Sequence, residues 1–400
     1  METKSLSEVS FIKQGRYLAP AEMSNVITPT FTVPVWGANG LLGYAREATY
    51  EDAIPLVTCR GNGCGLVQWT DGRANISNNS MAIIPSDISD ARYLYYVLLA
   101  SDFHPVITGS AQPQITVTHL STLQVSWSED KAVRDAIAHI LGTLDDKIEL
   151  NRRQSETLQE MARALFKAWF VDFEPVRAKM SGRWQRGQTL PGLPAHLWDL
   201  FPDHLVETEH GEVPMGWTMR PVADFADIKG GKQLGKERIA ETGQIPVFGG
   251  AGIMGYTEDY NAEGFVISVG RVGAYCGQFF RHRGKAWINN NASLIKQKED
   301  YLGEWLFLAL LHADIDVIKK GAAQPFVSNG DVAKLPLLWP QEQVIRSFSE
   351  IIVSLIRKQE GLEAETKQLA ALRDTLLPKL ISGELRVTDA ERILGGKDKE

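Results

Sequence analysis

Two stretches of the chain carry apolar residues at alternating spacings of three and four, which is the pattern of one face of an amphipathic helix. The first runs through Ile137, Leu141, Leu144, Ile148, Leu158 and Leu165, and the second through Phe348, Ile352, Leu355, Leu362, Leu369 and Leu376. Each heptad seam predicts a helix that packs along a partner helix. We expect the first helix from about Ser128 to Trp169, roughly 60 Å at 1.5 Å per residue, and the second to start at Pro340.

One such helix alone would equally fit packing on its own neighbouring module. Two matching seams in one chain favour pairing of the helices with each other. Both seams are polar in the middle, at Asn151 and Ser155 in the first and at Gln359 and Thr366 in the second. Polar seam residues fix the register of a helix pair at some cost in stability.

The chain before each helix repeats at a shift of 212 residues. Residues 33–37 (Val-Pro-Val-Trp-Gly) match residues 245–249 (Ile-Pro-Val-Phe-Gly), and Cys64-Gly65 matches Cys276-Gly277. The stretch from Gly109 to Gln112-Pro113 matches that from Gly321 to Gln324-Pro325, while residues 12–15 match 228–231 at a shift of 216 and the helices match at 211. Short β-branched runs bounded by glycines, such as residues 53–57 and 265–269, predict strands and turns in both copies.

The repeat predicts an α+β chain of two tandem α/β modules, each followed by a long helix, with the helices paired as an antiparallel coiled coil. The modules are residues 1–127 and 218–339, and the helical regions are residues 128–180 and 340–390. Residues 181–217, rich in Gly and Pro, form a linker, and residues 391–400 form a disordered tail.

Composition favours a globular protein of the cytoplasm. Apolar residues make up 44% and charged residues 23% of the chain, near the averages for soluble proteins. The three cysteines have neither disulfide nor zinc spacing. The start of the chain lacks the pattern of a signal peptide, and residues 305–311 are far shorter than the ~20 apolar residues of a membrane span.

The formal net charge of −7 predicts no general affinity of the chain for nucleic acid, which is itself negatively charged. Residues 1–130 carry 7 Lys/Arg and 12 Asp/Glu, a net −5, and residues 217–340 carry 14 and 13, a net +1. If the chain contacts nucleic acid, the contact must therefore be local or shared with a partner.

Motifs for catalysis are missing from the sequence. There is no GxxxxGK[ST] phosphate loop and no HExxH pair, and the acidic residues between 202 and 209 have no neighbouring lysine for a nuclease. Residues 248–252 (Phe-Gly-Gly-Ala-Gly) resemble the glycine loop of methyltransferases, but turn glycines explain them, and no Asn-Pro-Pro-aromatic motif accompanies them. We expect no catalytic residue and no metal site.

This order of segments resembles the specificity subunit of a Type I restriction-modification enzyme, over nearly the whole chain. The similar landmarks are the Pro-Val-aromatic-Gly turn ending in Gly-Tyr, Arg271-Val272-Gly273, the Gly-small-small-Gln-Pro stretch, Gln341-Glu342-Gln343, the helix end at residues 372–383, and the run 161–180 with Trp169-Phe170-Val171-Asp172-Phe173-Glu174-Pro175. The first copy departs from the family at Trp127-Ser128-Glu129, which leaves the helix start open.

The resemblance implies two target recognition domains that bind a bipartite, asymmetric site on double-stranded DNA, with no catalysis of their own. It also implies two modification subunits, which bring S-adenosylmethionine and methylate adenine. Restriction subunits would bring ATP, Mg and cleavage, and no cofactor or membrane contact is implied for this chain.

Planar side chains suit base readout, because Arg, Asn and Gln bond base edges bidentately in the major groove. The DNA-binding candidates are Lys13, Arg60, Arg73, Asn75, Asn78, Lys229, Lys232, Arg271, Arg281, Arg283 and Asn290. Ordinary surface charge or a capped turn remains the alternative for each. Two other functions also stay open: a scaffold that organises partners without reading DNA, and a self-sufficient methyltransferase or nuclease.

Overall fold

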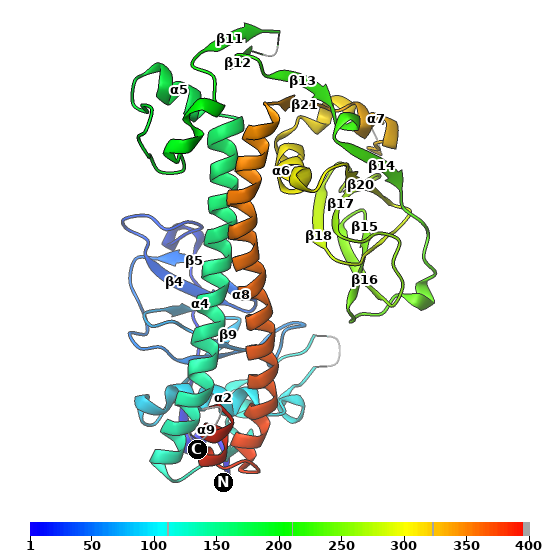
Figure 1. The fold of residues 1–400 in the computed structure, drawn as a ribbon. Helices are drawn as coiled ribbons and strands as arrows, with labels where there is room; N and C mark the ends of the chain where they lie inside the picture. The colour runs from blue at the N-terminus through cyan, green and yellow to red at the C-terminus, as the bar shows by residue number, and fades with distance from the viewer. Residues whose placement is uncertain (110–111, 210, 322–323, 395–400) are drawn as a thin grey trace, which may run out of the picture. The chain divides into compact units, whose positions relative to one another are not determined.

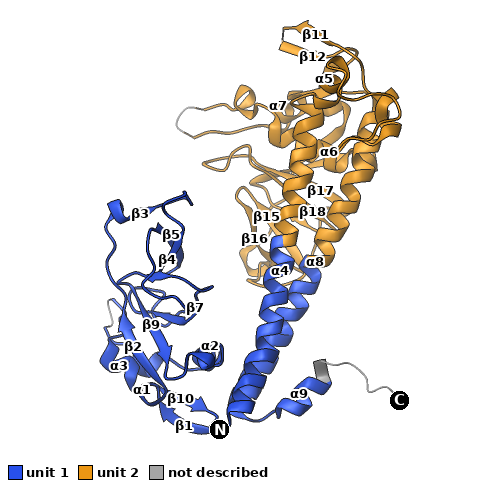
Figure 2. Cartoon of the chain, turned by 90° about the vertical axis from the view of Figure 1, so that its left-hand side faces the viewer, with its two compact units in different colours: residues 1–153, 363–400 blue, residues 154–362 orange. Residues whose placement is uncertain are grey.

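The computed structural model describes residues 1–109, 112–209, 211–321 and 324–394, and the chain divides into two compact units (Figure 2). Unit 1 consists of residues 1–153 and 363–400, and unit 2 consists of residues 154–362. Each long helix contributes one part to each unit. The units therefore cut across the linear domain order, because a helix hairpin joins segments that are distant in the sequence.

The described part of unit 1 contains three sheets and a set of short helices. The first sheet has the order β2 (Ser10–Gln14), β9 (Ser80–Pro85), β6 (Pro55–Thr58) and β7 (Val67–Trp69), all antiparallel. The second has the order β3 (Met23–Ser24), β5 (Gly40–Ala45), β4 (Val33–Gly37) and β8 (Asn75–Ile76), with β4 and β8 parallel. The third joins β1 (Glu2–Ser5) to β10 (Gln124–Trp127). The helices are α1 (Leu6–Val9), α2 (Ala91–Leu99) and α3 (Val117–Ser121).

Unit 2 repeats this topology. Its sheets have the orders β14 (Ala226–Gly230), β20 (Ala292–Gln297), β17 (Phe265–Gly270), β18 (Phe279–Arg283), then β16 (Gly252–Thr257), β15 (Ile245–Gly249), β19 (Trp287–Ile288), then β13 (Thr218–Pro221) with β21 (Pro336–Trp339). The module helices are α6 (Gly303–His312) and α7 (Asn329–Lys334). The predicted duplication of a mixed α/β module is therefore confirmed in the strand order, although β3 is matched in the described part of unit 2 only by an isolated bridge between Ala240 and Tyr256.

The two long helices are α4 (Lys131–Phe170) and α8 (Glu342–Ser382), which lie side by side (Figure 1). In unit 1, Arg373 donates to Asp145 at 2.8 Å, and Asn151 donates to Glu365 at 2.8 Å. Rising numbers on α4 meet falling numbers on α8, so the predicted antiparallel pairing is confirmed.

Most seam residues are withdrawn from solvent by this pair and by the adjoining modules. The buried ones are Ile137, Leu141, Leu144, Ile148, Leu158, Phe348, Ile352 and Leu376, and the half-buried ones are Leu165, Leu355, Leu362 and Leu369. The apolar core of each unit is continuous from the module onto its part of the helix pair.

Two boundaries differ from the sequence prediction. Helix α4 begins at Lys131 and not at Ser128, because the Ser128 amide donates to the Tyr93 hydroxyl at 3.2 Å while Asp130 accepts the Ala132 amide at 2.9 Å. The expected tail is helical up to residue 394, in α9 (Val387–Leu394), where Ala390 is fully buried. Residues 395–400 of that tail lie outside the described residues.

The predicted linker is packed. After α5 (Glu174–Met180), Trp184 and Leu197 are fully buried in the core of unit 2, and Lys179 lies 4.3 Å from the centre of the Trp198 ring. The hairpin of β11 (Leu205–Thr208) and β12 (Gly211–Pro214) follows. Aromatic residues make this segment part of the fold, which Gly and Pro content alone does not reveal.

Candidate nucleic-acid interface

Three loops that are distant in the sequence meet in each module, and the same backbone hydrogen bonds hold them. In unit 1 the Gly61 amide donates to the Pro113 carbonyl oxygen at 3.0 Å, and in unit 2 the Gly273 amide donates to Pro325 at 3.0 Å. Two further backbone bonds of unit 1 have counterparts in unit 2. The Cys59 amide donates to the Asn79 carbonyl oxygen as the Arg271 amide does to that of Asn291, and the Ile115 amide donates to Cys59 as the Val327 amide does to Arg271. We call residues 59–65 and 271–277 loop A of each module. The repeated Gln-Pro landmarks thus anchor loop A, although residues 110–111 and 322–323 between them and the preceding glycines lie outside the described residues.

A glycine follows the first strand of the four-stranded β2 or β14 sheet in each module. At this glycine the backbone passes close to the turn after β8 in module 1 and to the turn after β19 in module 2. A Cβ atom on Gly15 would lie 2.1 Å from the Ser77 carbonyl oxygen, and one on Gly231 would lie 2.0 Å from that of Asn289. Real Cβ atoms do not approach an oxygen so closely, so only glycine fits both places. The repeat at a shift of 216 therefore records a close backbone contact.

The candidates in module 1 divide into exposed and engaged side chains. Lys13 and Arg60 are exposed, and Asn78 is half-buried. Arg73 pairs with Glu51 at 2.8 Å. Asn75 is fully buried and donates to the Glu47 carbonyl oxygen at 2.6 Å, so its amide group belongs to the interior and cannot meet a base edge.

In module 2, Lys229, Lys232 and Asn290 are exposed. Arg281 and Arg283 are both bound to the buried carboxylate of Glu304, with Arg283 at 2.9 Å and also 3.1 Å from Glu360 on α8. Burial raises the pKa of Glu304 against the opposing effect of the two arginines. Both arginines thus hold β18 to α6, and Arg283 also holds it to α8, a role that the sequence pattern does not reveal.

Each module contains five arginines, and one in each module stands apart from the rest. In module 1, Arg16, Arg73 and Arg92 form ion pairs and Arg46 stacks on Phe31; in module 2, Arg220, Arg238, Arg281 and Arg283 form ion pairs. The guanidinium groups of Arg60 and Arg271 make no hydrogen bond or ion pair with any residue that the structure describes, and the Arg271 Nε is buried without a partner. Arg271 is the first residue of loop A in module 2, where module 1 has Cys59, and Arg60 is the second residue of loop A in module 1, where module 2 has Val272. Two of the eleven candidates therefore lie in the same loop of the two modules, one position apart.

Comparison with known proteins assigns the chain to a family. The family profile described as Type I restriction modification DNA specificity domain matches residues 1–160 and 214–369, which contain the two repeats. The chain belongs to this family. It is 28% identical over 410 residues to the Type I restriction enzyme HindI specificity subunit of Haemophilus influenzae, covering 86% of this chain and 89% of that one. It is 23% identical over 337 residues to the MjaIX specificity subunit of Methanocaldococcus jannaschii, covering 77% and 72%.

The crystal structure of a Type I restriction-modification S subunit from M. genitalium matches with a TM-score of 0.64 over 95% of each chain, at 18% identity, and supports the fold alone. Membership of the specificity-domain family supports a role in DNA sequence specificity. Specificity subunits of this family act with DNA and with the other subunits of a restriction-modification complex.

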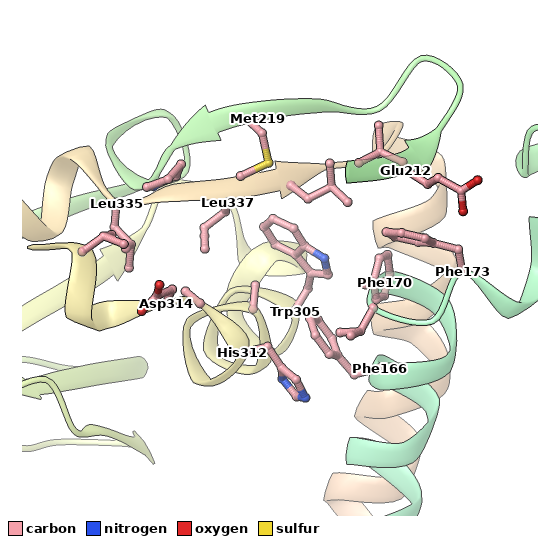
Figure 3. A pocket seen from close by; sticks show the side chains of 17 residues that line it. Phe166, Phe170, Phe173, Glu212, Met219, Trp305, His312, Asp314, Leu335 and Leu337 are labelled. Atoms are coloured by element: carbon pink, nitrogen blue, oxygen red, sulfur yellow. The ribbon is translucent and has the colours of Figure 1, made fainter. Parts of the chain in front are cut away.

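A pocket in unit 2 of this family member is lined mostly by apolar side chains. It has a volume of about 620 Å³ and lies where the end of α4 meets α6, β13 and β21 (Figure 3). Phe166 and Phe170 come from α4 and face Trp305 of α6, while Met219 lies on the strand side. His312 is bonded to its own helix at 2.9 Å, and the described lining contains no serine, threonine, cysteine or lysine that could act as a nucleophile.

Two searches over the described residues concern metal binding and membranes. No group of three His, Cys, Asp or Glu side chains in the described residues could hold a metal ion. None of the described helices is both long and apolar enough to cross a membrane.

The residues that sequence reasoning missed lie where the modules meet the long helices. Asp145 on α4 accepts from the Tyr96 hydroxyl at 2.7 Å and from Arg373, and Arg92 pairs with Asp146 at 2.5 Å. A comparison of the two helices at their shift of 211 would have found such positions. In that alignment Asp145 matches Ile356, so a charged residue stands where the other copy has an apolar one.

Proposed function

We propose that this chain is the DNA-recognising subunit of a Type I restriction-modification complex and that it binds a bipartite, asymmetric site. The observation that carries the proposal is the pair of loops A, which share one backbone frame and each present one arginine without a protein partner. An approximate two-fold repeat suits the symmetry of the duplex backbone, and different side chains on one frame allow the half-sites to differ. The α4–α8 pair would set the nonspecific gap between them.

Chemistry would be supplied by other subunits. Two modification subunits would bring S-adenosylmethionine and methylate adenine, and restriction subunits would bring ATP, Mg and cleavage, in the cytoplasm where the DNA lies. The helix pair is the proposed dock for the modification subunits. This division of labour agrees with the family membership and with the apolar lining of the pocket in unit 2.

In this acidic chain, contact with DNA would depend on individual positively charged side chains. Residues 1–130 carry a net −5, so most of the surface of this region would repel phosphates. A guanidinium that no carboxylate neutralises keeps its full charge for DNA, which singles out Arg60 and Arg271 from the ion-paired arginines. We expect tight binding only in complex with the modification subunits.

The test is to co-express the chain with its modification subunit and to sequence the methylated sites in host DNA. The proposal predicts a split motif with a fixed gap, and replacement of residues 1–127 by another family module should change one half only. Methylation without sequence preference would contradict DNA recognition by this chain. A motif that changes on both sides after one replacement would contradict the assignment of one half-site to each module.

A further inference from the structure

The contacts between each module and its long helix differ in charge between the two units. The helices are equivalent at a shift of 211 and the modules at 212. A cavity of about 210 Å³ in unit 1 is lined by Arg92, Ala138, Gly142 and Asp146, and one of about 330 Å³ in unit 2 is lined by the equivalent residues Glu304, Ser349, Val353 and Arg357. In unit 1 the module contributes Arg92 and the helix contributes Asp146, whereas in unit 2 the helix contributes Arg357 and the module contributes Glu304, which is bound by Arg283 of the same module.

A second place of contact is polar in unit 1 and apolar in unit 2. In unit 1, Asp145 on α4 is bound by Tyr96 of α2 at 2.7 Å and by Arg373 of α8 at 2.8 Å. The three equivalent residues of unit 2 are Leu308, Ile356 and Ala162, all buried in one apolar core. The helix contact of unit 1 therefore needs the charges of Asp145 and Arg373, whereas a charge at the equivalent place in unit 2 would lie in an apolar core.

The middle of the helix pair shows the same asymmetry. Asn151 is fully buried and donates to Glu365 at 2.8 Å, and Lys147 lies 3.5 Å from that carboxylate. The equivalents of Asn151 and Glu365 are Leu362 and Gln154. A single buried amide is known to fix the choice of partner in paired helices, because a mismatched register leaves it without a hydrogen bond.

We infer that these side chains restrict the pairing to α4 with α8 and exclude pairing of either helix with its own copy in a second chain. In an α4 pair, Asp145 would face Ala162 of the second chain in place of Arg373, since positions 162 and 373 are equivalent. In an α8 pair, Arg373 would face Ile356. Either arrangement leaves a charge in an apolar contact, which is far more costly than replacing the whole ion pair by apolar residues.

The inference goes beyond DNA recognition and does not depend on it. Two repeats with similar backbones could otherwise associate in mixed combinations between chains, as the shared topology permits. The inverted charges keep one copy of each repeat in the helix hairpin. The two modules are then presented as an unlike pair, which an asymmetric target requires.

A full-length chimera tests this by forcing α4 to pair with itself. Residues 342–382 are replaced by a copy of residues 131–171, which places alanine at position 373 and aspartate at position 356. We expect amide hydrogen exchange along α2 and the first half of α4 to speed up at least about tenfold relative to the natural chain. Arginine restored at position 373 should recover protection in unit 1, and isoleucine restored at position 356 should recover it in unit 2.

The matched control places an arginine at position 375 of the chimera, which corresponds to the exposed Ala164. It adds the same charge to the same helix without reaching Asp145. Protection equal to that of the natural chain in the unrepaired chimera overturns the inference. So does equal recovery by the control, or failure of every repaired version to fold.

A second measurement uses the natural chain and needs no chimera. Asp145→Ile and Arg373→Ala should each speed up exchange in unit 1 roughly tenfold to a hundredfold, a range set by the 20% and 27% exposure of the two side chains. The triple variant Tyr96→Leu/Asp145→Ile/Arg373→Ala, which copies the chemistry of unit 2 and leaves no buried hydroxyl without an acceptor, should return to within about threefold of the natural chain. Single variants without effect, or a triple variant as unstable as the losses combined, overturn the inference.

Discussion

Removal of Arg271 and removal of Arg281 together with Arg283 should have different effects on DNA binding and on the stability of module 2. Arg271 has no partner among the described residues, whereas Arg281 and Arg283 share the buried carboxylate of Glu304. We predict that Arg271→Ala weakens DNA binding and leaves unit 2 stable. The double variant Arg281→Ala/Arg283→Ala should destabilise unit 2 first and affect DNA only as a consequence.

The structure sets the size of each effect. Loss of Arg271 removes no ion pair from the protein, so the free energy of unfolding should change by less than about 0.5 kcal/mol. If its guanidinium bonds a guanine edge, binding should weaken by about 1 to 3 kcal/mol, roughly 5-fold to 150-fold. If it contacts a phosphate, binding should weaken on all sequences and the salt slope should fall by about 1.

The double variant leaves Glu304, whose side chain is 3% exposed, without its two arginines, and breaking a buried pair in this way costs about 3 to 5 kcal/mol. Burial already raises the pKa of Glu304 above 4.5, and loss of both arginines should raise it further. The folded state then binds a proton more readily than the unfolded state. Stability of the double variant should therefore increase as pH falls through the pKa of the folded state toward the lower pKa of the unfolded state.

The assay is titration of the complex with modification subunits against a duplex carrying its methylated site, at several salt concentrations. Exchange of amide hydrogens in unit 2 reports stability in parallel. Arg238→Ala is the control, since Arg238 is exposed and paired with Asp259 in the same module. Natural affinity and an unchanged motif in an intact Arg271→Ala complex would refute the argument, as would a loss of stability above about 1 kcal/mol.

Three further predictions concern the fold. Phe348→Ala should cost unit 2 about 3 to 5 kcal/mol in chemical denaturation, because Phe348 is fully buried and its ring centre lies 5.0 Å from that of Phe170; a loss below about 1 kcal/mol would contradict the packing. Gly15→Ala should lower the free energy of unfolding of unit 1 by about 1 to 3 kcal/mol, because the added methyl group drives β2 away from the turn after β8. An unchanged free energy of unfolding would contradict this close contact. Asp331, whose pKa is lowered to about 2 by hydrogen bonds from Lys320 and Ser328, should stabilise α7 above pH 3.8 and lose this effect as pH falls through about 2. Hydrogen exchange of α7 in Asp331→Asn should accordingly differ from the natural chain at pH 5 and converge with it near pH 2, and no difference at pH 5 would count against the interaction.

The sequence predicted the parts of the fold that depend on repetition. Apolar spacing located both long helices, because the 3.6-residue period of a helix is visible in one dimension. The self-match at 212 located the second module before any strand was known. Helix α4 nevertheless begins three residues later than expected, since Tyr93 holds the Ser128 amide, and the residues that decide such an end lie in a different segment.

Individual site residues were far less predictable. Arg271 and Arg283 look alike in sequence, each close to a glycine in a β-rich segment, yet one lacks a protein partner and the other is bound to Glu304 and Glu360. Partners of this kind are set by tertiary packing. Asn75 shows the same limit, because its burial follows from the parallel pairing of β8 with β4, which no local pattern encodes.

The two copies have diverged in two kinds of place, and the difference bears on how specificity can change. The backbone bonds that anchor loop A are the same in both modules, while the exposed side chains on that frame differ. The contacts between modules and helices also differ, but there each change is matched by a change in the partner, as with Asp145 and Arg373 against Ile356 and Ala162. We therefore expect that exposed side chains can be exchanged one at a time to alter the target. Residues at the helix contacts can be exchanged only in sets, so a new module should be grafted onto the chain with its own helix contacts adjusted to α4 or α8.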